Sequence, residues 1–140
     1  MMDIDIDTLV PHRRPLRLID EVIAISGESA TTAATVTPAW PTFRNGSAHA
    51  LVLIELVAQT AAIIGGYKAL TDPEDGRVKS GMLVAIKQAT FAVDTIPVGT
   101  RITTWAETHV LLENFKEMIG VAKIGDKIIG EMTLQGVQSV

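Results

Sequence analysis

The sequence has no cysteine among its 140 residues, so disulfide bonds and thiolate metal sites are excluded. Its three histidines, His12, His49 and His109, stand far apart in the chain and form none of the close pairs that metal sites use. We therefore expect neither a metal nor any other cofactor.

An excess of positive charge is also missing, because the formal net charge is −4 and the pI is near 5.3. This balance argues against a general nucleic-acid-binding protein. The first ten residues, MMDIDIDTLV, contain no basic segment followed by a long apolar one, so we expect no signal peptide. These features predict a cytoplasmic protein.

The chain is long enough and apolar enough for a single folded domain that spans residues 1–140. Hydrophobic residues make up 47% of it, and the mean hydropathy is +0.30, which is sufficient for a substantial core. It shows no internal repeat and no low-complexity segment.

The longest apolar run extends from Ala48 to Gly66, and its length and composition predict a buried helix. Its length approaches the roughly 20 residues that span a bilayer. We reject a membrane span, because a charged residue at the bilayer centre costs about 2.5 kcal/mol or more. The flanking segments also read as strands that can cover a core helix.

Glu55 is the residue in this helix that most needs an explanation. Its sequence neighbours from Leu51 to Val57 are otherwise apolar, so a carboxylate there either finds partners or stays protonated. Gln59 follows at the i+4 position on the same helix face and is expected to hold the carboxylate or line the same pocket. We interpret Glu55 as a catalytic acid or base, and Gln59 as a substrate-binding residue.

Segments rich in β-branched residues lie on both sides of this helix, and we expect each to be a strand. They are Leu16–Ile25, Ala30–Thr37, Gly81–Val93, Arg101–Leu112, Phe115–Lys123 and Ile128–Val137. Gly125-Asp126 suits a two-residue hairpin turn, and Pro38–Ser47 reads as an irregular loop with Ser47 as the helix N-cap. The order predicts an α+β hotdog fold, in which a curved antiparallel sheet of about six strands encloses the helix.

Three stretches of the chain resemble the 3-hydroxyacyl-ACP dehydratases of the hotdog fold. Residues 11–22 read PHRRPLRLIDEV, residues 53–59 read LIELVAQ, and a strand beginning at Gly81 is followed by Ile96-Pro97-Val98-Gly99. The resemblance covers nearly the whole chain. It implies an acyl thioester substrate, carried by acyl carrier protein (ACP) or coenzyme A (CoA), a homodimer, and a basic rim that receives the carrier. Basic residues available for such a rim are Arg13, Arg14, Arg17, Arg44, Lys79 and Lys87.

The loop before the helix departs from the dehydratase pattern. Where these enzymes carry the catalytic histidine, fourteen residues before the helix glutamate, this chain has Pro41, and the second histidine position is Asn45. The stretch 43–50, FRNGSAHA, is more similar to a divergent branch associated with aryl-polyene synthesis, in which this loop often has no histidine.

Dehydration of a 3-hydroxyacyl thioester needs a base for the C2 proton, an acid for the leaving hydroxyl, and donors for the thioester oxygen. Backbone N–H groups of Ala50 and Leu51, at the expected start of the helix, are the candidate donors. His49 replaces the missing base only if the helix start or a partner subunit brings it close to Glu55, and it is otherwise a capping or solvent-facing residue. Two other functions stay open: a thioesterase that uses Glu55 to activate water, and a non-catalytic acyl-binding or partner subunit.

Overall fold

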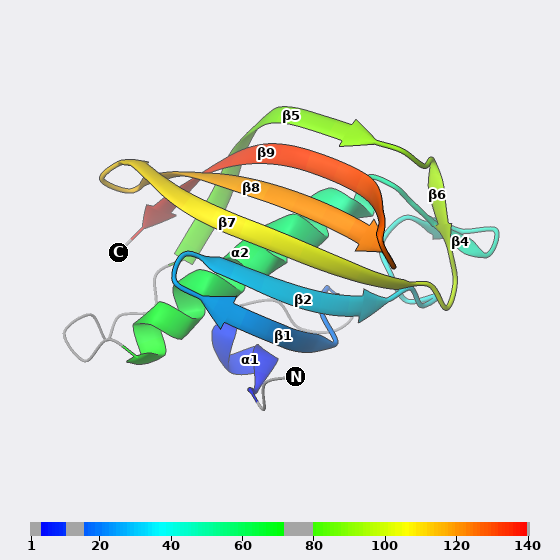
Figure 1. The fold of residues 1–140 in the computed structure, drawn as a ribbon, viewed down its shortest axis with the longest axis horizontal. Helices are drawn as coiled ribbons and strands as arrows, with labels where there is room; N and C mark the ends of the chain where they lie inside the picture. Colours follow the sequence, from blue (N-terminus) through cyan, green and yellow to red (C-terminus); the bar gives the residue numbers. More distant parts are fainter. Residues whose placement is uncertain (1–3, 11–15, 72–79, 140) are drawn as a thin grey trace.

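The computed structural model describes residues 4–10, 16–71 and 80–139. In chain order the elements are α1 (Ile6–Leu9), β1 (Glu21–Ser26), β2 (Ser29–Thr35), β3 (Phe43–Arg44), β4 (Ser47–His49), α2 (Val52–Thr71), β5 (Ser80–Phe91), β6 (Thr95–Pro97), β7 (Arg101–Leu112), β8 (Phe115–Ile124) and β9 (Lys127–Ser139). A six-stranded antiparallel sheet has the order β1-β2-β7-β8-β9-β5, and a small second sheet has the order β3-β4-β6. The large sheet curves around α2 (Figure 1), which confirms the predicted hotdog fold.

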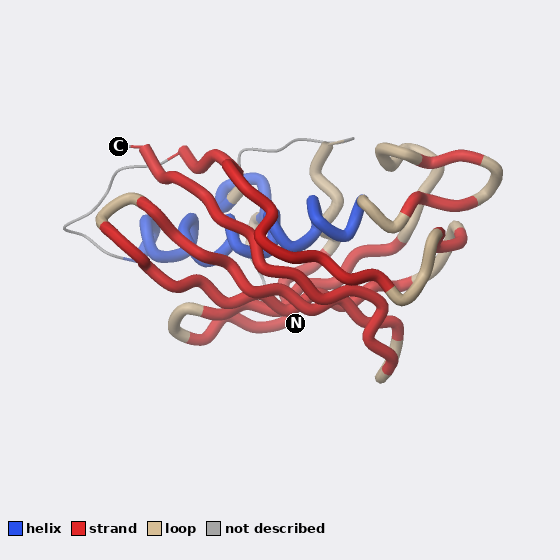
Figure 2. Tube along the Cα trace, turned by 90° about the horizontal axis from the view of Figure 1, so that it is seen from above, coloured by secondary structure: helices blue, strands red, loops and turns tan. Residues whose placement is uncertain are grey.

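Helix α2 is the centre of the core because it is apolar on most of its circumference. Its residues Leu53, Leu56 and Val57 are fully buried, and it packs on β2, β7 and β8. Figure 2 shows the helix lying along one side of the large sheet. The helix approaches this sheet closely, because a Cβ at Gly120 of β8 would collide with the side chain of Val57. Glycine at this position therefore sets the distance between helix and sheet.

The predicted helix start at Ala48 is wrong, because α2 begins at Val52. Residues 47–49 form strand β4, which pairs with β6 and places Ala48 opposite Ile96. Ser47 consequently lies in a strand and is not the helix N-cap. Ala48 is fully buried in its strand, as many apolar residues of α2 are in the helix. The composition therefore does not change where the strand ends and the helix begins, and it could not locate this boundary.

Two-residue turns connect several of the strands. The predicted turn at Gly125-Asp126 is confirmed, since Ile124 pairs with Lys127 and Gly125 has a positive φ of 58°. Asn45-Gly46 also forms a tight hairpin, with φ of 53° and 83°, where we expected an irregular loop. Two positive φ values are what a type I′ turn requires, and Asn-Gly is its preferred sequence.

The segment before β1 is not a strand, although we predicted one from Leu16. Strand β1 begins at Glu21, and Leu18 and Ile19 are fully buried outside the sheet. The backbone of Leu18 bonds to a side chain of α2 instead of to a neighbouring strand. The segment before β1 therefore has the composition of a strand, but it packs against α2 instead of joining the sheet.

Helix α2 is long and apolar enough to cross a membrane by length and composition, with a hydropathy of 1.3. Half of that helical window is buried inside the fold. A core helix of a soluble protein has the same length and composition, and α2 buries its apolar surface against strands of the large sheet.

Candidate active site

Glu55 and Gln59 lie on one face of α2 and are hydrogen-bonded to each other. The amide nitrogen Nε2 of Gln59 donates to Oε1 of Glu55 at 3.0 Å. Glu55 is half-buried, while Gln59 is completely buried. The two residues meet because positions i and i+4 of a helix are neighbours, which is the arrangement predicted from their spacing.

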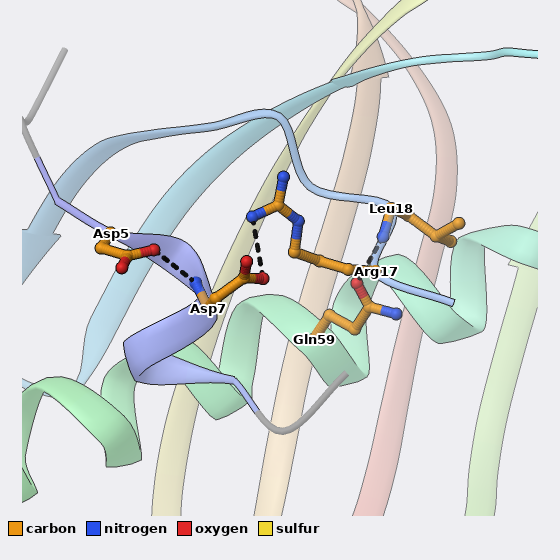
Figure 3. A network of polar contacts seen from close by, with 5 residues as sticks. All are labelled: Asp5, Asp7, Arg17, Leu18 and Gln59. Carbon is orange, nitrogen blue, oxygen red and sulfur yellow. Dashed lines mark hydrogen bonds and ion pairs between the residues drawn. The ribbon is translucent and has the colours of Figure 1, made fainter. Parts of the chain in front are cut away.

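The orientation of the Gln59 amide is fixed by two further bonds to the N-terminal segment. Its oxygen accepts from the backbone N–H of Leu18 at 2.9 Å, and Nε2 also donates to the carbonyl of Leu16 at 2.7 Å. Figure 3 shows the amide of Gln59 directed at the backbone of Leu18. Both N–H groups and the oxygen of the amide are thus used. A flipped amide would place its NH₂ group against the N–H of Leu18 and its oxygen against the oxygens of Leu16 and Glu55.

Glu55 is less enclosed than its sequence neighbours suggested. Leu51, in the turn that precedes α2, is 52% exposed, and Ile54 is half-buried like Glu55 itself. A helix turns by about 100° per residue, so the fully buried Leu53 and Leu56 lie on other faces of α2 than Glu55. Of the two outcomes that we weighed, the structure shows a partner for Glu55, which is the side chain of Gln59.

His49 lies at the end of β4, three residues before α2, and its side chain is exposed. The ring nitrogen Nδ1 accepts a hydrogen bond from the backbone N–H of Leu51 at 3.1 Å. The backbone N–H of His49 in turn donates to Oγ1 of Thr42 at 3.2 Å. His49 therefore caps the start of the helix, as in the alternative that we weighed against a base.

The two backbone donors predicted at the helix start are both engaged in this structure. The N–H of Ala50 donates to the carbonyl of Asp94 at 2.9 Å, and the N–H of Leu51 donates to His49. Ala50 is buried, whereas Leu51 is exposed beside the half-buried Glu55. A substrate oxygen reaches the N–H of Leu51 only if the ring of His49 moves away.

Thr42 is a neighbour of His49 that the sequence did not indicate. It has a φ of 65°, which is rare for any residue other than glycine and an outlier for a β-branched one. Backbone strain of this kind costs about 1–3 kcal/mol and concentrates at functional sites. The residue precedes β3 and directly follows Pro41, the position that corresponds to the dehydratase histidine.

The basic residues considered for a carrier-binding rim do not form an unpaired cluster in the part of the chain that is described. Arg17 bonds to Asp7 at 3.0 Å (Figure 3), and Lys87 bonds to Glu117 at 3.3 Å. Arg44 is exposed on β3. The other candidates lie outside the described residues, and they are Arg13, Arg14 and Lys79.

A metal site finds no support among residues 4–10, 16–71 and 80–139. No three side chains of histidine, aspartate or glutamate come together there in a way that could hold an ion. The groups described at the N-terminal end of α2 are the carboxyl group of Glu55, the imidazole of His49 and backbone amides.

Comparison with known proteins shows that this chain is similar to dehydratases over nearly its whole length. The family model of the ApeP-like dehydratases matches residues 4–138. The 3-hydroxyacyl-[acyl-carrier-protein] dehydratase FabZ of Thermoanaerobacter pseudethanolicus is 28% identical over 145 residues, which cover 96% of this chain and 95% of that protein. FabZ of Koribacter versatilis is 26% identical over 132 residues, covering 93% of this chain and 84% of that protein.

Solved structures share the fold at lower sequence identity. A chain of the dehydratase heterocomplex ApeI:P from Xenorhabdus doucetiae superposes with a TM-score of 0.86 at 19% identity, covering 99% of this chain and 93% of that one. A hypothetical thioesterase with coenzyme A from Streptococcus pneumoniae superposes with a TM-score of 0.63 at 12% identity, covering 85% and 84%. Dehydratases and thioesterases therefore have this fold in common, and the fold alone does not separate the two reactions.

Proposed function

The chain belongs to the ApeP dehydratase family, and from this premise we propose that it removes water from a 3-hydroxyacyl thioester. The observation that carries the proposal is the carboxylate of Glu55, held by Gln59 on the partly open side of α2. The sequence relatives named as 3-hydroxyacyl-ACP dehydratases support the same reaction class.

In the proposed reaction Glu55 serves as base and then as acid. Its carboxylate takes the proton from C2 of the substrate, and the electron pair of that C–H bond is delocalised onto the thioester oxygen. When the C3–O bond then breaks, this electron pair forms the C2–C3 double bond. The protonated carboxyl group gives the same proton to the departing hydroxyl, which leaves as water. The enzyme returns to the carboxylate form, and no second base is needed.

The substrate proposed is an acyl chain on acyl carrier protein, used in the cytoplasm in fatty acid, polyene or polyketide synthesis. This assignment rests on the FabZ relatives, whose names include the carrier protein. An acyl-CoA presents the same pantetheine thioester and is the alternative carrier. Comparing turnover of one acyl chain on both carriers distinguishes them.

We further propose that the protein is a homodimer that pairs through strand β5. This strand is an edge of the large sheet, and it exposes Met82, Leu83, Val84 and Ile86 by between 40% and 68%. Exposed apolar edge strands pair readily with another chain, and a dimer forms when the same edge meets its copy across a two-fold axis. A related hotdog subunit is the alternative partner, because the similar Xenorhabdus protein is part of a heterocomplex.

A thioesterase that uses Glu55 to activate water is the second candidate. It is favoured by the absence of a histidine at Pro41 and by the partial exposure of Glu55. A non-catalytic acyl-binding subunit is the third candidate, and it would bind the thioester without converting it.

The deciding experiment is incubation of the purified protein with a 3-hydroxyacyl thioester, followed by product analysis. A dehydratase forms an enoyl thioester and releases no thiol, whereas a thioesterase forms a free acid and a thiol. The Glu55→Gln variant is the matched control for contaminating activity. Release of thiol, or binding without any product, would contradict the dehydratase assignment.

A further inference from the structure

We infer that His49 polarises the thioester carbonyl through its Nε2–H group and does not act as the general base. The inference rests on the proposed function, since it assigns a role in the same site. It follows from the hydrogen bond at Nδ1, from the engagement of the backbone donors, and from the strained residue that holds His49 in place.

The hydrogen bond from Leu51 determines which ring nitrogen of His49 carries the proton. Nδ1 accepts from the backbone N–H of Leu51 at 3.1 Å, so Nδ1 has its lone pair there and no hydrogen. A neutral imidazole carries one N–H, which must then be on Nε2. The nitrogen that remains available on this exposed ring is therefore a donor, and a donor cannot take the C2 proton.

A donor is what the thioester oxygen needs at this end of the helix. Negative charge develops on that oxygen when the C2 proton leaves, and a fixed N–H group stabilises it. The N–H of Ala50 is bonded to Asp94 and the N–H of Leu51 is bonded to His49. The Leu51 N–H orients the imidazole by donating to Nδ1, and the imidazole presents its own N–H at Nε2. The ring therefore offers a donor in place of the two backbone N–H groups that are already bonded.

The position of His49 is fixed from its backbone side as well. Its N–H donates to the hydroxyl of Thr42 at 3.2 Å, and Thr42 is held at a φ of 65°. His49 also pairs with Thr95 in the small sheet, so a strand and a strained turn hold its backbone, and the bond at Nδ1 orients its ring. A preorganised donor of this kind requires little rearrangement during the reaction.

Two substitutions separate the two nitrogens of the ring. In His49→Asn the side-chain oxygen occupies a place near that of Nδ1, so it still accepts from Leu51, but no donor reaches the position of Nε2. In His49→Gln the longer amide places an N–H near the position of Nε2, while the bond to Leu51 is weakened. Hydrogen exchange at the Leu51 amide and thermal unfolding report whether the cap is retained.

The test uses a saturated acyl-pantetheine thioester with a carbon-13 label at its carbonyl, which lacks the 3-hydroxyl and therefore cannot be dehydrated. Infrared spectroscopy of the bound thioester measures the carbonyl stretch in the wild type and in both variants. We expect a lower frequency in the wild type and in His49→Gln than in His49→Asn. In parallel, we expect kcat for a 3-hydroxyacyl thioester to fall about 10²–10³-fold in His49→Asn and less than about tenfold in His49→Gln.

Each other result identifies a different role. Equal carbonyl frequencies together with loss of turnover in both variants would make His49 a base and overturn the inference. Full turnover in His49→Asn would make it a cap alone, which also overturns it. A frequency shift without dehydration by the wild type would support the carbonyl donor and contradict only the proposed reaction. Failure of the wild type to bind the thioester would contradict both.

Discussion

Gln59 lies one helical turn after Glu55 and donates a hydrogen bond to its Oε1 at 3.0 Å. The same amide is bonded to the backbone of Leu16 and Leu18, more than 40 residues earlier in the chain. Gln59 consequently links the packing of the N-terminal segment to the direction of the carboxylate. Changes at Glu55 and Gln59 should therefore have separable effects on chemistry and on stability.

Glu55→Gln should abolish turnover while leaving the fold intact. The new amide oxygen can accept the bond from Gln59 that Oε1 accepts now, so we expect the free energy of unfolding to change by less than about 1 kcal/mol. Loss of the only proposed proton acceptor should lower kcat by about 10²–10⁴-fold. Steady-state kinetics and urea unfolding measure the two effects, and the exposed Glu131→Gln provides the matched control. Full activity, or an unfolded protein, would make Glu55 a structural residue.

Gln59→Leu should impair both stability and turnover. It leaves the N–H of Leu18 and the carbonyl of Leu16 without their buried partner, and each such loss costs about 1–3 kcal/mol. Glu55 also loses the donor that orients it, and misplacement of a catalytic group can lower the rate by about 10²-fold. Glu131→Leu at an exposed position of β9, away from the proposed dimer edge, is the control and should change neither quantity. A stable Gln59→Leu variant with normal kcat would show that Glu55 is oriented by other groups.

The sequence could predict the Glu55–Gln59 pair but not the rest of this network. Spacing along one helix depends only on helical geometry, so the i, i+4 contact followed directly from residue numbers. The bonds to Leu16 and Leu18 depend on tertiary packing of a distant segment, which no local pattern encodes. Strand β7 was predicted with its observed bounds, Arg101–Leu112, because its β-forming residues lie between two turn signals, Pro97-Val98-Gly99 and Glu113-Asn114.

The errors at the helix start have a different physical origin. Ala48 and Ala50 are buried both where the chain is a strand and where it turns into the helix, so hydrophobicity alone could not locate Val52 as the first helical residue. The Asn45-Gly46 hairpin was available as a signal, because this dipeptide favours a type I′ turn. The positive φ of Thr42 could not be predicted from the sequence, because threonine rarely adopts this conformation.

Gly120→Ala should be destabilising because of one specific neighbour. A Cβ at this position would collide with Val57, and overpacking a closely packed core costs about 1–3 kcal/mol. Val57→Ala alone should also cost about 0.5–3 kcal/mol, because it removes buried methyl groups. The double variant should lose less unfolding free energy than the two single variants lose together, and the difference should be an interaction energy of about 0.5–3 kcal/mol. Simple additivity in urea unfolding would show that the sheet relieves the collision in another way.

Ile86→Lys should dissociate the proposed dimer. Ile86 is 50% exposed on β5, and a lysine there opposes close pairing of two apolar edge strands because its charge would lose hydration in the interface. Leu112→Lys is the matched control, since Leu112 is 72% exposed at the β7–β8 turn and away from the β5 edge. Light scattering at micromolar concentration should report a dimer for the wild type and for Leu112→Lys, and a monomer for Ile86→Lys. A monomeric wild type, or a dimeric Ile86→Lys variant, would contradict pairing through β5. The monomeric variant can keep its circular dichroism spectrum and still lose turnover. That result would show that the active site depends on the partner subunit, which would then cover the open side of α2 where Glu55 lies.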